Sequence, residues 1–111
     1  MSQPSSLSKP PSDDPAEWTA LQPGVEMRRL FKHMHSGYEV ALVRYRAGAS
    51  VPMHRHVADE HVYVLEGSQR DERGRYPAGS YVFNAAGSSH GVSSDEGCLA
   101  LVHWLAPVQF I

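Results

Sequence analysis

Turn-forming dipeptides divide most of this 111-residue chain into short segments, and their spacing is the strongest constraint on its fold. The segments carry β-branched and aromatic residues, which favour strands, and no window shows a sustained helical period. Turns about 8–12 residues apart are typical of antiparallel sandwiches and barrels, so the sequence predicts an all-β fold. The turns are Pro23-Gly24, Ser36-Gly37, Ala47-Gly48, Glu66-Gly67, Arg73-Gly74, Ala78-Gly79 and Ala86-Gly87, and the expected strands include 25–31, 38–46, 61–66, 80–84 and 99–105.

The start of the chain differs from the rest. Residues 1–16 contain five serines and four prolines and almost no residue suited to a core, so we expect a flexible leader there. Residues 17–111 then form a single domain. A domain of this size buries only about 60–65% of its unfolded surface and would be stabilised by a partner subunit, which favours a homodimer.

Composition excludes several classes of partner. Lys and Arg number 10 against 12 Asp and Glu, a formal charge of −2, which argues against nucleic acid or an anionic membrane as the main partner. A single cysteine excludes an internal disulfide framework and fits a reducing compartment. No secretory signal and no stretch of about 18 apolar residues occurs. We therefore expect a cytoplasmic protein that binds a small molecule.

Seven histidines in so short a chain direct attention to metal binding. His54 and His56 are separated by one residue, so on a strand both side chains leave the same face. Glu60 follows after residues where the chain can turn. Two imidazoles and one carboxylate can hold Fe, Mn, Ni or Zn as divalent ions with positions left open. His90, in a loop of small residues, is available as a fourth ligand.

The residues from Gly48 to Gly67 resemble the first conserved motif of the cupins, with every specified position filled. The residues from Gly79 to Ser94 resemble the second cupin motif at Gly79, Gly87 and His90. They depart from it at Ala85, where proline is usual, and at Ser94, where asparagine is usual. These departures affect the rigidity of a turn rather than metal ligation.

Within the cupins, the chain is similar to the ChrR-type branch over roughly residues 38–105. That branch includes the zinc-binding cupin domain of certain anti-sigma factors and relatives of an iron-dependent, diketone-cleaving dioxygenase. The resemblance implies an RmlC-like jelly-roll barrel of two antiparallel sheets with a metal inside. The metal ligands of the family fall on His54, His56, Glu60 and His90. The matching blocks are 59–67, 76–82, 87–90 and 94–98.

The other histidines are weaker candidates. His61 adjoins Glu60 and therefore points to the opposite face of the same strand. His33 and His35 lack a nearby carboxylate and fit an exposed or interface strand. His103 shares its face with leucines, so it is either a core histidine or a proton donor that lines the pocket.

Three further residues or segments have simple structural interpretations. Asp59 is expected in the turn before Glu60. Cys98 is expected to be a small buried hydrophobic residue. The segment 69–75 mixes charges of both signs and is predicted to be a solvated hairpin loop.

Two functions remain open from the sequence. The first is a dioxygenase that depends on a divalent metal, in which Glu60 either stays a ligand or acts as a base. The second is a non-catalytic zinc-binding sensor, in which the same four ligands close a tetrahedral site. A third, metal-free binding or isomerisation of a sugar-like molecule, is disfavoured by the complete ligand set. The identity of the metal and the substrate are both left open.

Overall fold

The computed structural model describes residues 4–111 and confirms the all-β fold. Within this range a single 3-10 turn, Pro15–Glu17, precedes ten strands. The strands are β1 (Thr19–Gln22), β2 (Val25–Lys32), β3 (Glu39–Tyr45), β4 (Ser50–Arg55), β5 (Glu60–Asp71), β6 (Gly74–Pro77), β7 (Tyr81–Asn84), β8 (Ser89–Ser93), β9 (Cys98–Trp104) and β10 (Gln109–Phe110).

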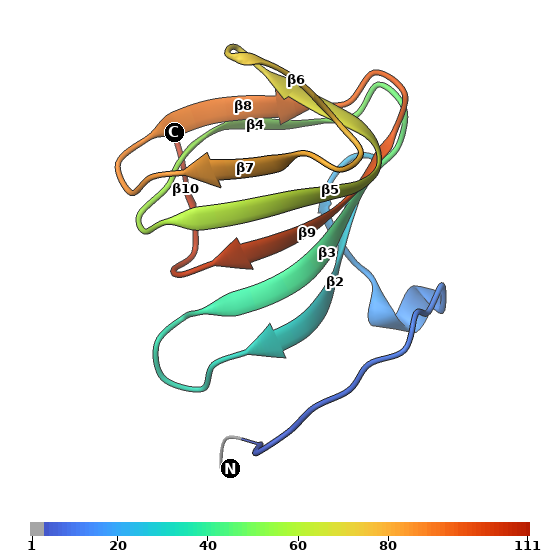
Figure 1. Ribbon diagram of the computed structural model, residues 1–111, viewed down its shortest axis with the longest axis vertical. Helices are drawn as coiled ribbons and strands as arrows, with labels where there is room; N and C mark the ends of the chain where they lie inside the picture. The colour runs from blue at the N-terminus through green and yellow to red at the C-terminus, as the bar shows by residue number, and fades with distance from the viewer. Residues whose placement is uncertain (1–3) are drawn as a thin grey trace.

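The strands form two curled antiparallel layers that share β5 (Figure 1). The first layer has the order β1-β2-β3-β9-β5, and β7 pairs with the other side of β5. The second layer contains β8, β4 and β10, with β6 paired to the end of β5. Residues 60–67 of β5 pair with β9, whereas residues 68–71 pair with β6. This arrangement confirms the predicted barrel of two antiparallel sheets.

The core lies on the inner face of the curled layers because alternate residues of each strand point inward. In β3 the buried side chains are Ala41, Val43 and Tyr45, and in the neighbouring β9 they include Ala100 and Val102. The remaining core residues are Val25, Met27, Val62, Val64, Val82, Val92 and Cys98. Cys98 is therefore the buried hydrophobic residue that the sequence predicts.

The prediction for residues 69–75 was only partly right. A hairpin is present, but its turn consists only of Glu72 and Arg73, and residues 69–71 continue β5. Gln69 and the Asp71 side chain are buried rather than solvated. The charges in this segment are therefore divided between the outside of the barrel and its interior.

The segment before β1 contacts the first layer. The Lys9 ammonium donates a hydrogen bond to the Arg29 carbonyl oxygen. Trp18 is buried, and the guanidinium carbon of Arg44 lies over it, 3.8 Å from the centroid of the Trp18 ring. Residues 1–3 of the predicted leader lie outside the described residues, and the flexibility of 1–16 stays a prediction. Among residues 4–111, no helix is long and apolar enough to cross a membrane.

Gly67 lies where β5 passes from one layer to the other. Its φ of +68° is in the left-handed region, which glycine adopts without the steric cost that a side chain brings. A Cβ atom at this position would lie 1.9 Å from the Gly97 carbonyl oxygen. That oxygen also accepts a hydrogen bond from the Ser68 amide at 3.1 Å. The crossing of β5 therefore requires glycine on two grounds, conformation and space.

We predict that Gly67→Ala lowers the free energy of unfolding by at least about 3 kcal/mol, since it adds a clash to the left-handed penalty of about 1–2 kcal/mol. Gly79→Ala is the matched control, because Gly79 has φ +91° but a Cβ atom there would meet no other atom within 4 Å. It should cost only about 1–2 kcal/mol. Urea unfolding measures both, and equal losses would contradict the steric argument.

Candidate metal centre

Three buried histidines meet on the inner face of the second layer. His54 is in β4 and His56 follows its end, two residues on, so both rings point inward as predicted. His90 pairs with His54 across the β4–β8 ladder. It was expected in a loop of small residues, but it is a strand residue of β8. The ring centroids are 4.7–5.1 Å apart, and the three side chains are at most 5% exposed.

Each ring is oriented through its Nδ1 atom. His54 Nδ1 lies 2.9 Å from the Pro52 carbonyl oxygen, and His56 Nδ1 lies 3.1 Å from the Ser88 carbonyl oxygen. A carbonyl oxygen only accepts hydrogen bonds, so both Nδ1 atoms must donate. A neutral ring that is protonated on Nδ1 has a free lone pair on Nε2. Burial lowers the pKa of His54, which favours the neutral ring.

His90 is oriented by a carboxylate. Its Nδ1 atom is 2.9 Å from Asp71 Oδ2, and both side chains are at most 3% exposed. The other Asp71 oxygen accepts hydrogen bonds from the Tyr76 hydroxyl at 3.2 Å and the Arg73 amide at 2.9 Å. Burial opposes ionisation of Asp71, but His90 and the Arg73 amide outweigh it, so the pKa of Asp71 is lowered. In metal sites, a carboxylate commonly accepts a hydrogen bond from the histidine nitrogen that does not bind the metal, and so fixes the orientation of the ring.

The Nε2 atoms provide the test of whether a metal fits. His56 Nε2 and His90 Nε2 are buried and have no hydrogen-bond partner among residues 4–111. Buried polar atoms without partners are rare in folded proteins. One candidate ligand atom from each of His54, His56 and His90 lies within 4.8 Å of the other two. Three imidazole nitrogens are a donor set suited to Fe, Ni, Cu or Zn, so the residues present fit a divalent metal ion.

Glu60 lies beside the histidines at the start of β5, but its oxygens already have partners. Oε1 accepts a hydrogen bond from Asn84 Nδ2 at 2.9 Å, and Oε2 accepts one from Trp104 Nε1 at 2.6 Å. Oε1 is also 3.3 Å from His56 Nε2. Burial opposes ionisation of Glu60, but its contacts with His56 and Asn84 outweigh it, so its pKa is lowered and the group is ionised at neutral pH.

Two of the residues that hold the site together were missed by the sequence analysis. Asp71 lies in the segment that was predicted to be solvated. Asn84 links the two carboxylates, because its Oδ1 accepts a hydrogen bond from Arg73 at 2.6 Å while its Nδ2 donates to Glu60. Arg73 also approaches Asp71 Oδ2 at 3.4 Å. An asparagine at an inward position of β7 was the one signal for this link that the sequence offered.

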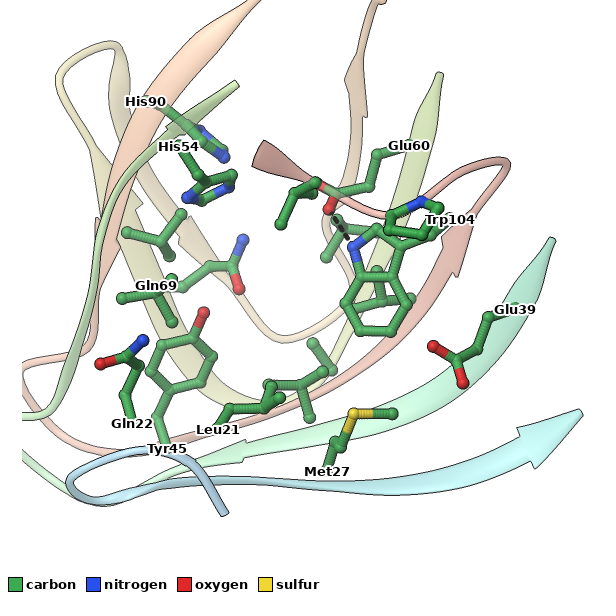
Figure 2. A pocket seen from close by; sticks show the side chains of 18 of the residues that line it. Leu21, Gln22, Met27, Glu39, Tyr45, His54, Glu60, Gln69, His90 and Trp104 are labelled. Atoms are coloured by element: carbon green, nitrogen blue, oxygen red, sulfur yellow. Dashed lines mark hydrogen bonds between the residues drawn. The ribbon is translucent and has the colours of Figure 1, made fainter. Parts of the chain in front are cut away.

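A cavity of about 260 Å³ opens beside the histidines (Figure 2). His54, His90 and Glu60 line one end of it, and Trp104 lies next to Glu60. Its walls are otherwise mainly the inward-pointing aliphatic residues Val43, Val51, Val62, Val92, Ala100 and Val102. The candidate metal site is therefore accessible from a small and mostly apolar chamber.

The remaining candidates lie away from this chamber. His61 points outward, as its position beside Glu60 predicts, and its Nδ1 atom is 2.6 Å from the Tyr81 hydroxyl. His103 is also on the outer face, 3.0 Å from the Tyr38 hydroxyl, so it does not line the pocket. Asp59 lies in the connection before β5, where it accepts a hydrogen bond from an amide.

His33 is half-buried and His35 is exposed, and both lie in the connection between β2 and β3 rather than on a strand. The His33 ring accepts hydrogen bonds from the amides of His35 and Ser36, both at 3.2 Å, and so stabilises the turn. Within the described part of the chain, neither ring forms an ion pair with a carboxylate. Neither residue joins the candidate centre.

Solved structures with the same fold include proteins of different function. An acetylacetone dioxygenase from Acinetobacter johnsonii is 16% identical, with a TM-score of 0.82 over 100% of this chain and 83% of that one. The Rhodobacter sphaeroides anti-sigma factor ChrR, in its complex with SigE, is 27% identical, with a TM-score of 0.70 over 78% of this chain and 48% of that one.

A Ralstonia eutropha protein of unknown function with a cupin-like fold is 20% identical, with a TM-score of 0.68 over 73% of this chain. The match spans 54% of that protein, so this chain corresponds to about half of its length. No curated protein matches the sequence. The model of the ChrR cupin-like domain, however, matches residues 12–107. This chain therefore belongs to the ChrR cupin-like domain family.

Proposed function

We propose that this chain is a metal-dependent enzyme of the dioxygenase type that acts on a small molecule. The observation that supports it is the placement of His54 and His90 at the wall of the apolar cavity. Structural zinc sites have all their positions filled by protein, whereas catalytic sites keep a position open to the substrate. A metal held by the three histidines would face a chamber large enough for a small molecule.

The proposal gives the histidines and Glu60 separate roles. His54, His56 and His90 would hold the ion through Nε2, and the ion would supply Lewis acidity and, if it is iron, electrons for the reduction of dioxygen. Glu60 would accept a proton from a substrate C–H or O–H group in the cavity. The role of Glu60 as a fourth ligand stays a prediction.

The zinc-binding sensor is the second candidate. It is favoured by the match to the ChrR cupin-like domain and by the 27% identity to an anti-sigma factor. In that case the same residues would hold zinc mainly to stabilise the barrel. The two functions differ in metal identity, in the ease of metal exchange and in reaction with oxygen.

Metal content tests the ligand set. We predict that His54→Ala and His90→Ala each lose most of the metal that the unmodified protein binds, because each leaves an incomplete site. His61→Ala is the matched control and should keep its metal, since His61 points away from the cluster. Elemental analysis of protein purified without a histidine tag measures all three. Unchanged metal in both cluster variants would show that the ligands are assigned wrongly.

Glu60→Gln extends the same measurement. The variant keeps an acceptor oxygen but removes the charge. Metal affinity should therefore fall sharply if Glu60 is a fourth ligand, and only modestly, through the loss of a nearby charge, if Glu60 is a base. Oxygen consumption separates the dioxygenase from the zinc-binding sensor. We expect iron-loaded protein to consume oxygen with acetylacetone, the compound in the name of one structural relative. Tightly held zinc without oxygen uptake would favour the sensor.

Asp71→Asn tests how His90 is oriented. The amide can present its NH2 group to His90 Nδ1 and so favour the wrong tautomer. We predict metal affinity about 10–100-fold weaker, the usual effect of losing such a partner. Asp95→Asn is the control, because Asp95 is exposed and bonds only Arg70 among the described residues. Competition with a chromogenic chelator measures both affinities, and equal values would contradict this role.

The proposal also includes a homodimer. The outer face of β5 and β7 exposes Tyr63, Leu65, Tyr81 and Phe83, each to 44–54%. None of these side chains carries a charge, so a second copy could pack on the same face about a twofold axis without electrostatic repulsion. Exposed apolar faces of this kind often mark interfaces.

Phe83→Glu tests the dimer. The substitution would place two carboxylates near each other at a twofold interface, so we predict at least about a tenfold weaker dimer by sedimentation equilibrium. Met53→Glu is the control, because Met53 is similarly exposed (45%) but lies on β4 of the other layer. An unmodified protein that is monomeric would show that the face serves another purpose.

A further inference from the structure

The cavity contains a second polar group of residues that the metal centre does not use. Tyr45 of β3 and Gln69 of β5 both line it, and they are 8% and 5% exposed. Figure 2 shows the Gln69 amide between the histidines and the Tyr45 hydroxyl, with both groups directed into the interior. They come from different layers of the barrel, so the fold rather than a local motif brings them together.

Neither group has a hydrogen-bond partner. Within residues 4–111, no side-chain or backbone group bonds the Tyr45 hydroxyl or the Gln69 amide. Both groups line the cavity without a partner among these residues, so each is available to a ligand there. Burial raises the pKa of Tyr45, which keeps the hydroxyl protonated as a donor. Gln69 can both donate and accept.

The charges around the cavity indicate what such a ligand carries. The ionisable residues of its lining, histidines and Tyr45 apart, are Glu39 and Glu60, and no Lys or Arg is among the lining residues. Glu39 already forms an ion pair with Arg29. A carboxylate or phosphate at the Tyr45–Gln69 end of the cavity would therefore lose its hydration without meeting a lysine or arginine that could pair with it.

The volume limits the size of the ligand. About 260 Å³ corresponds to eight or nine water molecules at about 30 Å³ each. A molecule of about that number of non-hydrogen atoms would fill the chamber. The aliphatic walls suit the carbon skeleton of a ligand. The ligand needs oxygen atoms only where they can contact polar side chains of the lining.

We infer that Tyr45 and Gln69 are the recognition site for an uncharged ligand of about eight non-hydrogen atoms, whose carbonyl or hydroxyl oxygen they hydrogen-bond. A second oxygen of the same ligand would face the histidines. This inference names the substrate class of the proposed enzyme, and it rests on the proposed function for the role of the histidine end. The hydrogen bonds at Tyr45 and Gln69 follow from the cavity itself.

Three probes of equal size test the inference on zinc-loaded protein, in which no turnover with oxygen is expected. Hexane-2,5-dione has two uncharged carbonyl groups. In 5-methylhexan-2-one a methyl group replaces one carbonyl oxygen, and in 4-oxopentanoate a carboxylate replaces one acetyl group. Ligand-observed NMR titration gives the three affinities. We expect the dione to bind at least about tenfold more tightly than 5-methylhexan-2-one, and more tightly than 4-oxopentanoate once the zinc, which could ligate a carboxylate, has been removed.

Two variants locate the effect. In Tyr45→Phe and Gln69→Leu the preference for the dione over 5-methylhexan-2-one should fall to about threefold or less. Tyr63→Phe is the matched control, since it removes a hydroxyl from the outer face and should leave the preference unchanged. Thermal unfolding confirms that each variant is folded. Because Tyr45→Phe removes a single atom, it keeps the test valid if Gln69→Leu is unstable.

The inference is overturned if the dione does not bind, if all three probes bind equally, or if 4-oxopentanoate binds as tightly as the dione to protein from which the zinc has been removed. It is also overturned if the preference persists in both variants. Metal content is measured on the same samples, so failure of the metal proposal is seen separately. Protein that holds no zinc but still prefers the dione would support the recognition site and reject the proposed metal chemistry.

Discussion

The hydrogen bonds to the Nδ1 atoms of three buried histidines are the interactions on which the candidate site depends. Pro52 and Ser88 offer carbonyl oxygens and Asp71 offers a carboxylate, so the Nδ1 atoms donate and the lone pairs are left on Nε2. Without these acceptors the rings could rotate or change tautomer, and the inward-facing nitrogens would not form a common donor set. The backbone near β4 and β8 thus fixes the chemistry of the site as well as its position.

Strand β5 connects the parts of the site because it belongs to both layers. Glu60, at its start, lies beside the histidines, and Asp71, at its end, bonds His90. The strand changes layer through a bulge near Val64 and the left-handed Gly67. A bulge inserts one extra residue, so beyond it the alternation of inward and outward side chains is shifted by one residue. Gln69 therefore faces the interior of the same barrel as Val64.

This change of parity explains what the sequence could and could not predict. Alternation correctly placed His54 with His56, and it placed His61 outside, because no bulge separates the residues compared. Continued from Glu60 along β5, the same rule would turn residues 69 and 71 outward. The bulge reverses it. The Glu66-Gly67 pair beside the bulge was expected to be a turn between strands, whereas β5 continues through it. Gln69 and Asp71, a ligand-facing amide and a histidine partner, were therefore hidden in a segment that looked solvated.

The position of Glu60 bears on whether a metal there has three or four protein ligands. To coordinate an ion, the carboxylate would turn toward the histidines and weaken its hydrogen bonds with Asn84 and Trp104. Each charge-assisted bond contributes about 1.5–3 kcal/mol, and the two donors lie on different strands, β7 and β9. On this ground we favour three-histidine ligation with Glu60 as a hydrogen-bonded neighbour, and the role of Glu60 as a fourth ligand stays a prediction.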